Sequence, residues 1–333
     1  QEIVYAAFAQ IEAVVIKRKE ELMAQISGLK TLENRTLFVG PDDKFPDGCR
    51  SCLLGSGLTA IRKTNKCNLQ CRFCYNYGEL DAIEPVGEGI WVIGGTKFYE
   101  NDIDLLLEIH KKPTGVAYVY LEPFMEIEKY YNIIQKFNKA GIYQHLYTNG
   151  TLATETTLKA LGEAGLDELR FNLGASGCAD KVIENIGIAK KYIKKVGIET
   201  PMTNEFFEKF FVKKQAVFDT GLDFINCAEL HLNPNNIENY WGEKMYIARH
   251  GYISPIWSRE LTLRFMAAAA KEKWNLVVHD CSNDTKFARD LNLGVKEGKW
   301  FGASSYTSEF LEIPYAIFLP VLRDEEFHFL VEE

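Results

Sequence analysis

The sequence KCNLQCRFCY at residues 66–75 holds three of the chain's eight cysteines, Cys67, Cys71 and Cys74, at the spacing C-x3-C-x2-C. Thiolate sulfur is the ligand that iron–sulfur clusters prefer. One compact loop with this spacing can bind three irons of a [4Fe–4S] cubane and leave the fourth iron open, as a reactive centre requires. A closed structural zinc site needs four ligands, and this loop offers three. The loop therefore predicts a cluster held by these three cysteines.

The motif resembles that of the radical S-adenosylmethionine (radical SAM) superfamily, in which an aromatic residue precedes the last cysteine, as Phe73 does here. The resemblance implies that SAM binds to the open iron through its amino and carboxylate groups. It also implies that the reduced cluster cleaves SAM to a 5′-deoxyadenosyl radical, which abstracts hydrogen from a substrate. Phe73 is then the aromatic residue beside the adenine, and Tyr75 is a second candidate whose alternative role is packing in the core.

Other functions are compatible with clustered cysteines. The loop alone is also compatible with a zinc knuckle. The alternative to an enzyme is therefore a non-catalytic regulatory protein that binds either zinc or an iron–sulfur cluster. Both alternatives predict that polar groups at the strand ends face solvent or serve packing. The enzymatic hypothesis predicts that these groups meet a ligand, because the carboxyl ends of barrel strands are where such folds keep their chemistry.

Two strand ends after the cysteine loop also resemble the superfamily. In YLEP at residues 120–123, Glu122 matches the acid of the family's Gly-Gly-Glu-Pro segment, which meets the SAM ammonium. Tyrosine and leucine replace the two glycines, which normally allow a close approach of the backbone. In YTNG at 147–150, Asn149 matches the family's Thr-Asn-Gly. An ordinary turn at a strand end is the alternative at both places.

Two further strands carry polar residues that the resemblance assigns to SAM. Arg170 and Asn172 alternate with apolar residues in LRFNL at 169–173, so both point to one face of the expected strand. Polar side chains inside a barrel are costly unless they meet a ligand, so contact with the SAM carboxylate or ribose is expected. Glu199 is expected to reach the ribose hydroxyls or the substrate. Placement in solvent is the alternative for Arg170 and Asn172, and an ordinary acid at a strand end is the alternative for Glu199.

The order of the elements predicts the fold class. From about residue 58 the sequence alternates between short β-branched or aromatic runs and helical patterns, which indicates βα units and a parallel sheet. Strands are expected at 58–62, 90–93, 115–121, 141–148, 169–173, 197–200, 223–227 and 274–279. Helices are expected at 1–33, 101–110, 126–140, 154–164, 179–194, 205–217 and 259–272, and loops at 34–57 and 231–258. Right-handed crossovers would curl the sheet into a partial or full parallel (β/α) barrel of the radical SAM type.

Three regions are expected along the chain. An N-terminal helix and a cysteine-containing loop occupy 1–57, the barrel occupies 58–280, and an irregular C-terminal extension at 281–333 covers one end of the barrel. The extension is rich in aromatic and apolar residues. The N-terminal part lacks the apolar core of a signal peptide, and no run of about 18 apolar residues is present, so a soluble cytoplasmic protein is expected.

A second group of cysteines precedes the barrel. Cys49 and Cys52 form a CxxC pair, which can bind one metal but needs further ligands. Cys281 is a distant third candidate, with His279 close to it. The pair therefore predicts a second metal or an auxiliary cluster, and a redox dithiol or buried thiols are the alternatives.

One histidine and the overall charge bear on the substrate. His231 follows the sixth strand of the βα repeat and is a candidate acid or base at the barrel mouth, although a lone histidine often has a structural role. The net charge is −8, so nucleic acid is not expected as a partner. A small molecule or a peptide or protein segment is the expected substrate. The cluster also needs a reductant such as flavodoxin or ferredoxin.

Overall fold

The fold is built around one large sheet. The computed structural model describes residues 17–32, 36–54, 58–80, 86–109, 115–247, 253–283 and 285. Within these residues an eleven-stranded sheet runs in the order β1-β2-β13-β10-β9-β8-β7-β6-β3-β4-β5. The ends of this order are not paired with each other, so the described sheet is open. The structure is thus a mixed α/β fold that corresponds to the partial form of the predicted barrel.

The centre of the sheet is parallel, as the alternation of the sequence predicts. Seven neighbouring strands pair in parallel in the order β13-β10-β9-β8-β7-β6-β3. Their bounds are β3 (Leu58–Arg62), β6 (Gly115–Tyr118), β7 (Tyr143–Thr148), β8 (Glu168–Phe171), β9 (Lys195–Pro201), β10 (Phe224–Ala228) and β13 (Val277–Cys281). Because all seven strands run the same way, their carboxyl ends meet at one edge of the sheet.

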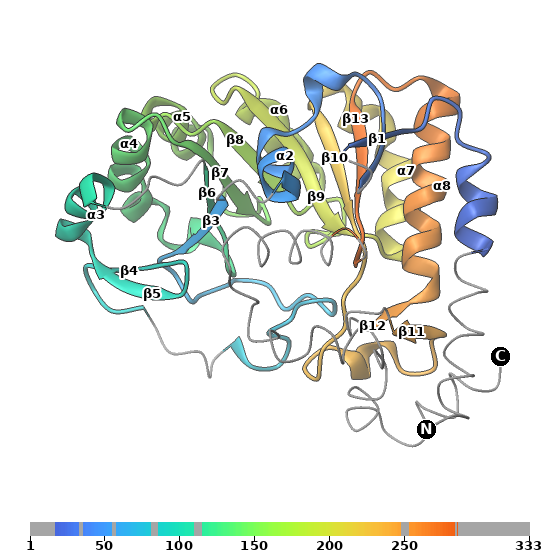
Figure 1. Ribbon diagram of the computed structural model, residues 1–333, viewed down its shortest axis with the longest axis horizontal. Coiled ribbons are helices and arrows are strands. Elements are labelled where there is room, and N and C mark those ends of the chain that lie inside the picture. Colours follow the sequence, from blue (N-terminus) through green and yellow to red (C-terminus); the bar gives the residue numbers. More distant parts are fainter. Residues whose placement is uncertain are drawn as a thin grey trace.

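Helices between the strands cover one face of the sheet (Figure 1). Their bounds are α3 (Ile103–Ile109), α4 (Tyr131–Lys139), α5 (Glu155–Ala164), α6 (Asp180–Ala189), α7 (Asn204–Asp219) and α8 (Ile256–Glu272), and the 3-10 segment η4 (Pro123–Tyr130) precedes α4. One alternate row of the parallel strands supplies fully buried core residues on this side, including Leu146, Leu169, Ile198, Ile225 and Val278. The β-strand period of two thus places one apolar row of each strand under the helices.

Antiparallel strands extend the sheet at both ends. β1 (Lys30–Leu32) and β2 (Thr36–Val39) form a pair that joins the sheet at β13. β4 (Ile90–Ile93) and β5 (Thr96–Tyr99) form a hairpin beside β3, and β4 confirms the strand expected at 90–93. A small separate sheet pairs β11 (Met245–Ile247) with β12 (Ile253–Pro255), after the 3-10 segment η5 (Ile237–Tyr240).

Two predictions for the N-terminal region are wrong. The described helix at its start spans 17–23, and Lys30–Leu32 is a strand, so no helix extends to residue 33. The loop predicted at 34–57 contains β2, the 3-10 segment η1 (Asp42–Lys44) and the helix α2 (Asp47–Leu54). Turn-forming glycine and proline dominate the local sequence there, but burial of apolar residues such as Phe45 and Leu53 outweighs them. Residues 1–16 and 286–333 lie outside the described residues.

The face of the sheet opposite the helices is polar and holds α2 (Figure 1). The second row of strand residues points to this inner face and includes the buried His145, Glu168, Arg170, Asn226 and His279. Helix α2 lies against it, because a Cβ added to Gly48 would stand 2.6 Å from Nδ1 of His145 and 2.7 Å from Nη2 of Arg170. The two faces therefore differ: one forms the core and the other forms a polar interior.

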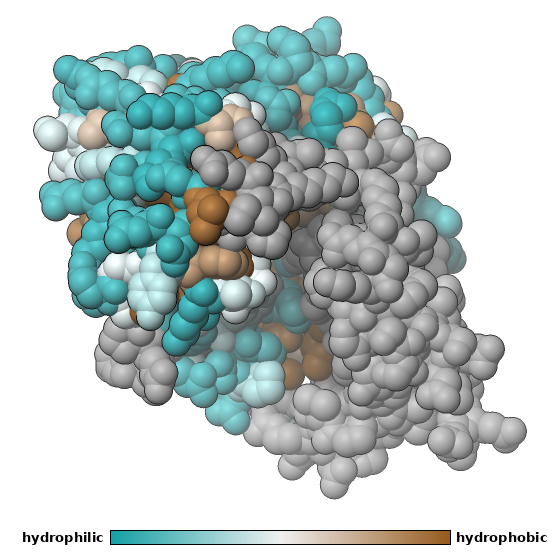
Figure 2. Space-filling model, turned by 60° about the vertical axis from the view of Figure 1, so that its left-hand side comes forward, coloured by the Kyte–Doolittle hydropathy of each residue, from teal (hydrophilic) through white to brown (hydrophobic). Residues whose placement is uncertain are grey.

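Most of the described surface is hydrophilic on the side shown in Figure 2. None of the described helices combines the length and apolarity that crossing a bilayer requires. The domain boundaries at 58 and 281 stay predictions, although β1, β2 and α2 are packed into the same sheet as the barrel strands.

Candidate active site

The cysteine loop, residues 66–75, follows β3 at the carboxyl edge of the parallel strands. Cys67, Cys71 and Cys74 are all half-buried. The loop curls through successive turns, since the backbone N–H of Cys74 donates to the carbonyl of Cys71 over 2.9 Å and that of Tyr77 donates to the carbonyl of Cys74 over 3.1 Å. The thiols of Cys67 and Cys74 lie near enough to that of Cys71 for their charges to affect it, and their role as cluster ligands stays a prediction.

The thiols of the loop repel one another when ionised. Burial raises the pKa of Cys67 and raises that of Cys71 to about 12, and the charges of Cys74 and Cys67 add to the increase at Cys71. A bound cation would therefore be needed to hold them as thiolates. Within the described residues no three Cys, His, Asp or Glu side chains are grouped tightly enough for a single metal ion. A cubane fits such a loop, because its thiolate ligands bind different irons and do not converge on one point.

A cavity of about 410 Å³ opens beside Cys71. We call it the loop cavity. Its aromatic walls are Phe73, Tyr240 and Trp257, and it reaches the start of α7. A flat ligand could stack on these rings, and polar groups from residues 203–205 line the same space. The structure thus places Phe73, the predicted adenine-side residue, at a cavity that borders a predicted cluster ligand.

Glu122 forms a buried junction at the edge of the sheet. Its carboxylate accepts hydrogen bonds from the Thr148 hydroxyl over 2.7 Å, from the Asn149 N–H over 2.6 Å and from the Phe124 N–H over 3.0 Å. Burial raises the pKa of Glu122 to about 7, although the three hydrogen bonds work against that increase. The backbone N–H of Glu122 donates to the carbonyl of Lys66, the residue before Cys67. Glu122 therefore ties the ends of β6 and β7 to the cysteine loop.

Asn149 makes a second link to the cysteine loop. Its side-chain amide donates to Oδ1 of Asn68 over 2.9 Å, and Asn68 donates to the hydroxyl of Thr151 over 2.8 Å. Asn172 lies at the end of the next strand, where its Oδ1 accepts from the Thr200 hydroxyl over 2.8 Å. Both asparagines thus stand at the carboxyl edge, as predicted, and their contact with SAM stays a prediction.

Arg170 and Glu199 lie deeper, on the inner face of the sheet. The Arg170 guanidinium is 2% exposed and pairs with Glu168 at 2.5 Å and with Glu199 at 2.6 Å. It also donates to the Tyr147 hydroxyl over 3.0 Å. The alternative of an arginine facing solvent is therefore excluded. The interior ion pairs give Arg170 and Glu199 partners within the protein, and their role toward SAM stays a prediction.

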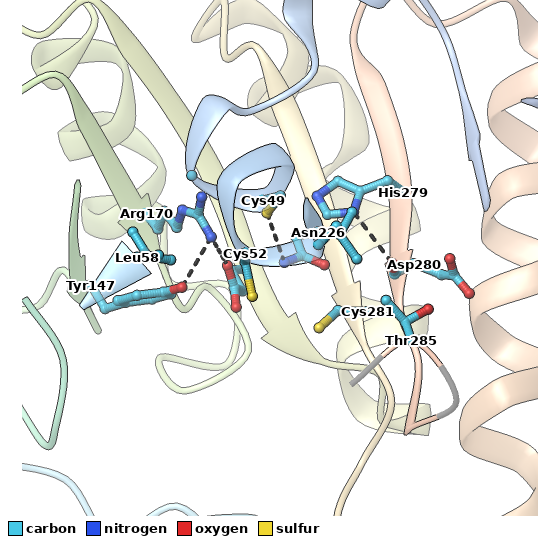
Figure 3. A pocket seen from close by; sticks show the side chains of 13 residues that line it. Cys49, Cys52, Leu58, Tyr147, Arg170, Asn226, His279, Asp280, Cys281 and Thr285 are labelled. Atoms are coloured by element: carbon cyan, nitrogen blue, oxygen red, sulfur yellow. Dashed lines mark hydrogen bonds and ion pairs between the residues drawn. The ribbon is translucent and has the colours of Figure 1, made fainter. Parts of the chain in front are cut away.

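A second cavity, of about 190 Å³, lies between α2 and the inner face of β7–β10 and β13 (Figure 3). We call it the inner cavity. The side chains of Cys49, Cys52 and Cys281 all line it, together with His279 and Asn226. Burial raises the pKa of Cys49, and burial lowers that of His279 to about 4, so this imidazole is neutral at pH 7. The structure therefore brings together the three cysteines that the sequence proposes for a second metal.

His231 lies beside the cysteine loop. Its ring contacts the ring of Tyr75 edge to face, with the centroids 5.1 Å apart. Tyr75 is 47% exposed, yet burial raises the pKa of its hydroxyl, and the charges of Cys281 and Cys74 add to this effect. The catalytic role of His231 and the adenine contact of Tyr75 stay predictions.

Four asparagines hold the cysteine loop in place. They lie in the segment 231–258, which the sequence predicts to be a loop. The side-chain amide of Asn236 donates to the carbonyl of Phe73 over 3.1 Å, and that of Asn239 donates to the carbonyl of Arg72 over 2.9 Å. Asn233 and Asn235 both donate to the carbonyl of Tyr75, over 3.0 and 2.8 Å. We call these four residues the asparagine clamp. Their close spacing in the sequence is a signal that could have singled them out.

The polar residues of the inner face were also missed by sequence reasoning. Asn226 lies between Ile225 and Cys227 in its strand, so the same period of two that drew attention to Arg170 could have identified it. His145 and Glu168 follow the polar residues Gln144 and Asp167, which obscure the alternation. Glu168 pairs with Arg170, and Asn226 lines the inner cavity.

The geometry agrees with comparisons to known proteins. Residues 61–209 match the family model described as the radical SAM superfamily. The chain is 27% identical over 205 residues to a putative glycyl-radical enzyme activating enzyme of Methanocaldococcus jannaschii, a match that covers 58% of this chain and 52% of that protein. It is 24% identical over 202 residues to the tungsten-containing aldehyde ferredoxin oxidoreductase cofactor-modifying protein of Pyrococcus furiosus, covering 53% of this chain and 52% of that protein.

The chain spans about half the length of the curated relatives it matches. Among solved structures, it resembles SuiB of Streptococcus suis bound to S-adenosylmethionine, with a TM-score of 0.49 and 14% identity over 67% of this chain and 49% of that one. That likeness is too distant to bear on function. The match to the family model covers residues 61–209 and includes all three cysteines of the loop, so this part of the chain resembles a radical SAM domain.

Proposed function

We propose that the chain is a radical SAM enzyme that reductively cleaves S-adenosylmethionine at a [4Fe–4S] cluster and abstracts hydrogen from a substrate. The observation that carries this proposal is the curled loop of Cys67, Cys71 and Cys74 at the carboxyl edge of a parallel sheet. When bound, the cluster supplies the electron that breaks a carbon–sulfur bond of SAM. The residues of the chain bind, orient and shield the reactants.

The loop cavity supports a role in binding SAM. In the loop cavity, Phe73, Tyr240 and Trp257 offer aromatic surface for an adenine next to Cys71. Glu122 and Asn149 hold the cysteine loop against the sheet through backbone and amide contacts.

A peptide or protein segment is the substrate that we propose. The support comes from the relative whose name describes a putative activating enzyme of a glycyl-radical enzyme. A small-molecule substrate is the alternative. The electron is proposed to come from a flavodoxin or ferredoxin. Mass spectrometry of substrate mixtures incubated with enzyme and SAM deuterated at C5′ should reveal the product, because the enzyme-derived radical exchanges hydrogen with its target.

Substitution of one loop cysteine tests the proposal. Cys71→Ala should abolish the conversion of SAM to 5′-deoxyadenosine under anaerobic conditions with dithionite, because one iron loses its thiolate ligand. The fold should be retained, since Cys71 is only half-buried. Cys227→Ala is the matched control, because Cys227 is buried in the core on the helix side and contacts no part of the cysteine loop. It should keep the cleavage activity.

Two outcomes would contradict the enzymatic proposal. Cleavage that survives in Cys71→Ala would show that the loop does not hold the reactive cluster. A colourless wild-type protein with one tightly bound zinc at the loop, and no binding of SAM, would favour the regulatory alternative instead. Metal analysis and absorption spectra of protein prepared without oxygen distinguish these cases.

A second metal centre at Cys49 and Cys52 is also part of the proposal. Its support is the inner cavity, which both cysteines line together with Cys281 (Figure 3). Cys49 and Cys52 both lie on helix α2 and are separated by three positions, so their side chains share one face of the helix. The redox dithiol is the alternative, and metal content after substitution of these cysteines separates the two.

A further inference from the structure

We infer that the inner cavity binds an iron–sulfur cluster of its own, with Cys49, Cys52 and Cys281 as thiolate ligands and His279 as a fourth ligand. The inference extends the proposed second metal centre and names its chemical class. It does not depend on the cluster of the cysteine loop, because the inner cavity shares no cysteine with that loop.

The three thiols come from two elements that meet only in the folded protein. Cys49 and Cys52 lie on α2, and Cys281 is the last residue of β13. All three line one cavity of about 190 Å³ (Figure 3). The two remaining cysteines outside the loop, Cys178 and Cys227, belong to the hydrophobic core instead. Cys49 packs in a smaller hydrophobic cluster and also lines the cavity, so it stands at the border between apolar and polar surroundings. Soft metal ligation would explain why three thiols share this cavity.

His279 is oriented as a metal ligand. It is 1% exposed, and its Nδ1 faces the backbone carbonyl of Asp280 at 3.4 Å. Its Nε2 is buried without any hydrogen-bond partner. A histidine that binds a metal typically directs its other ring nitrogen to a backbone carbonyl in this way. The ring is held in place by Phe45, whose centroid lies 4.9 Å from that of the imidazole. The unpartnered nitrogen is thus an open ligand position in a buried cavity.

Asn226 lines the inner cavity and contacts one of the proposed sulfur ligands. Its side-chain amide donates to Sγ of Cys49 over 3.7 Å, and its Oδ1 is buried without a partner. Donors to thiolate sulfur are a recognised means by which proteins hold and tune iron–sulfur clusters. Buried polar atoms without partners call for an explanation such as a bound group. An occupant of the inner cavity would meet these atoms.

The donor set of the inner cavity suits an iron–sulfur cluster. Three thiols and one imidazole line the same cavity. Soft thiolates are the preferred ligands of iron–sulfur clusters, and a cluster distributes its ligands over several irons.

Removal of the loop ligands isolates the inner site. The variant Cys67→Ala/Cys71→Ala/Cys74→Ala is reconstituted anaerobically with ferrous iron and sulfide. It should retain iron, acid-labile sulfide and the brown absorption of an iron–sulfur cluster. Addition of Cys49→Ala, Cys52→Ala and Cys281→Ala to this variant should remove all three signals. Addition of Cys178→Ala and Cys227→Ala should leave them, because those cysteines lie in the core.

The same experiment separates failure of this inference from failure of the proposed function. A loop variant that binds no iron, binds zinc without sulfide, or keeps its iron after the inner substitutions would overturn the inner cluster. The wild-type protein still tests the loop by its SAM cleavage in each of these cases. An inner cluster in a wild-type protein that does not cleave SAM would leave the inference standing and overturn the proposed function.

The fourth ligand has its own test. In the loop variant, His279→Cys should lower the midpoint potential of the retained cluster, because a thiolate replaces a neutral imidazole and favours the oxidised state. Potentiometric titration followed by electron paramagnetic resonance measures the shift. An unchanged potential and spectrum would overturn His279 as a ligand.

Discussion

At the scale of single residues, Tyr120 and Leu121 adopt backbone angles that normally belong to glycine. Their φ angles are +84° and +52°. The left-handed region costs a residue with a side chain roughly 1–2 kcal/mol. The Tyr120 ring is covered by the Arg62 guanidinium, 4.6 Å from its centroid. The chain thus has left-handed backbone angles, with side chains present, at the two positions where the family motif has glycines, next to Glu122.

This strain predicts an unusual order of stabilities at position 121. Leu121→Gly should be more stable than Leu121→Ala by about 1 kcal/mol, because both remove the half-buried side chain but only glycine relieves the left-handed angle. Urea unfolding measures the difference. Val119 is the control, since its φ is not positive, and there the glycine variant should be the less stable. Equal stability of the two variants at 121 would contradict the strain.

The carboxyl group of Glu122 predicts a pH-dependent stability. The pKa of Glu122 is raised from 4.5 to about 7 in the folded protein. Its contribution to stability is therefore fully present below about pH 4.5 and is lost as the pH rises through about 7. Glu122→Gln should flatten this part of the profile. It should also lower the free energy of unfolding by about 1–3 kcal/mol, because an amide NH₂ would face the donor N–H of Asn149.

Unfolding measurements at a series of pH values between 4 and 8 test this prediction. The slope between pH 5 and 7 should be smaller in Glu122→Gln than in the wild type. A variant with the same slope would show that another group titrates in this range.

At the scale of elements, the asparagine clamp joins the segment after β10 to the cysteine loop. Asn236 is fully buried, and its amide donates to the carbonyls of Phe73 and His231 over 3.1 and 3.3 Å. A single side chain therefore bridges the cysteine loop and the candidate residue at the barrel mouth. The clamp explains how an irregular segment without long helices can hold a ligand loop in one geometry.

The clamp predicts a change at the cluster that a loss of stability alone would not cause. Asn236→Ala should lower the free energy of unfolding by about 1–3 kcal/mol and alter the resonance spectrum of the reduced loop cluster. Asn185→Ala is the matched control, because Asn185 is also fully buried and donates to two carbonyls, those of Gly150 and Ala153. It should cost similar stability without altering the spectrum. Identical spectra in both variants would assign the clamp a purely structural role.

At the scale of the whole molecule, α2 closes the inner side of the open sheet. Its glycine, Gly48, allows the helix to rest on the charged inner face, where an added Cβ would stand 2.6 Å from His145 and 2.7 Å from Arg170. Arg170 cannot move aside freely, because it pairs with Glu168 and Glu199. The position of α2 sets the inner cavity and brings two of its thiols to β13.

Enlargement of Gly48 should disturb this packing. Gly48→Ala should lower the free energy of unfolding by about 1–3 kcal/mol, because the added methyl group is overpacked against fixed side chains. Gly187→Ala in α6 is the control, since the nearest atom to its added Cβ is 3.7 Å away. It should be neutral or stabilising by up to about 1 kcal/mol, as expected for alanine in a helix. Thermal unfolding compares both with the wild type, and equal losses would contradict the contact.

The sequence by itself determined the parts of this protein that depend on nearby residues. The spacing of Cys67, Cys71 and Cys74 defines a ligand loop, and the alternation of β-branched and helical runs predicts the parallel strands from β6 to β10. Glu122 and Asn149 were placed at the strand ends because strand length and turn residues are local properties. The assignment of 34–57 to a loop failed, because burial against the sheet makes a helix of residues that favour turns.

Only the tertiary structure decided which distant residues meet. It places Cys281 in one cavity with Cys49 and Cys52, and it presents the amide of Asn236 to the carbonyl of Phe73. No local propensity encodes such contacts, because they depend on the order of strands in the sheet and on which face each side chain points to. The polar interior exists because packing of the apolar rows under the helices leaves the alternate rows to face one another across a shared space.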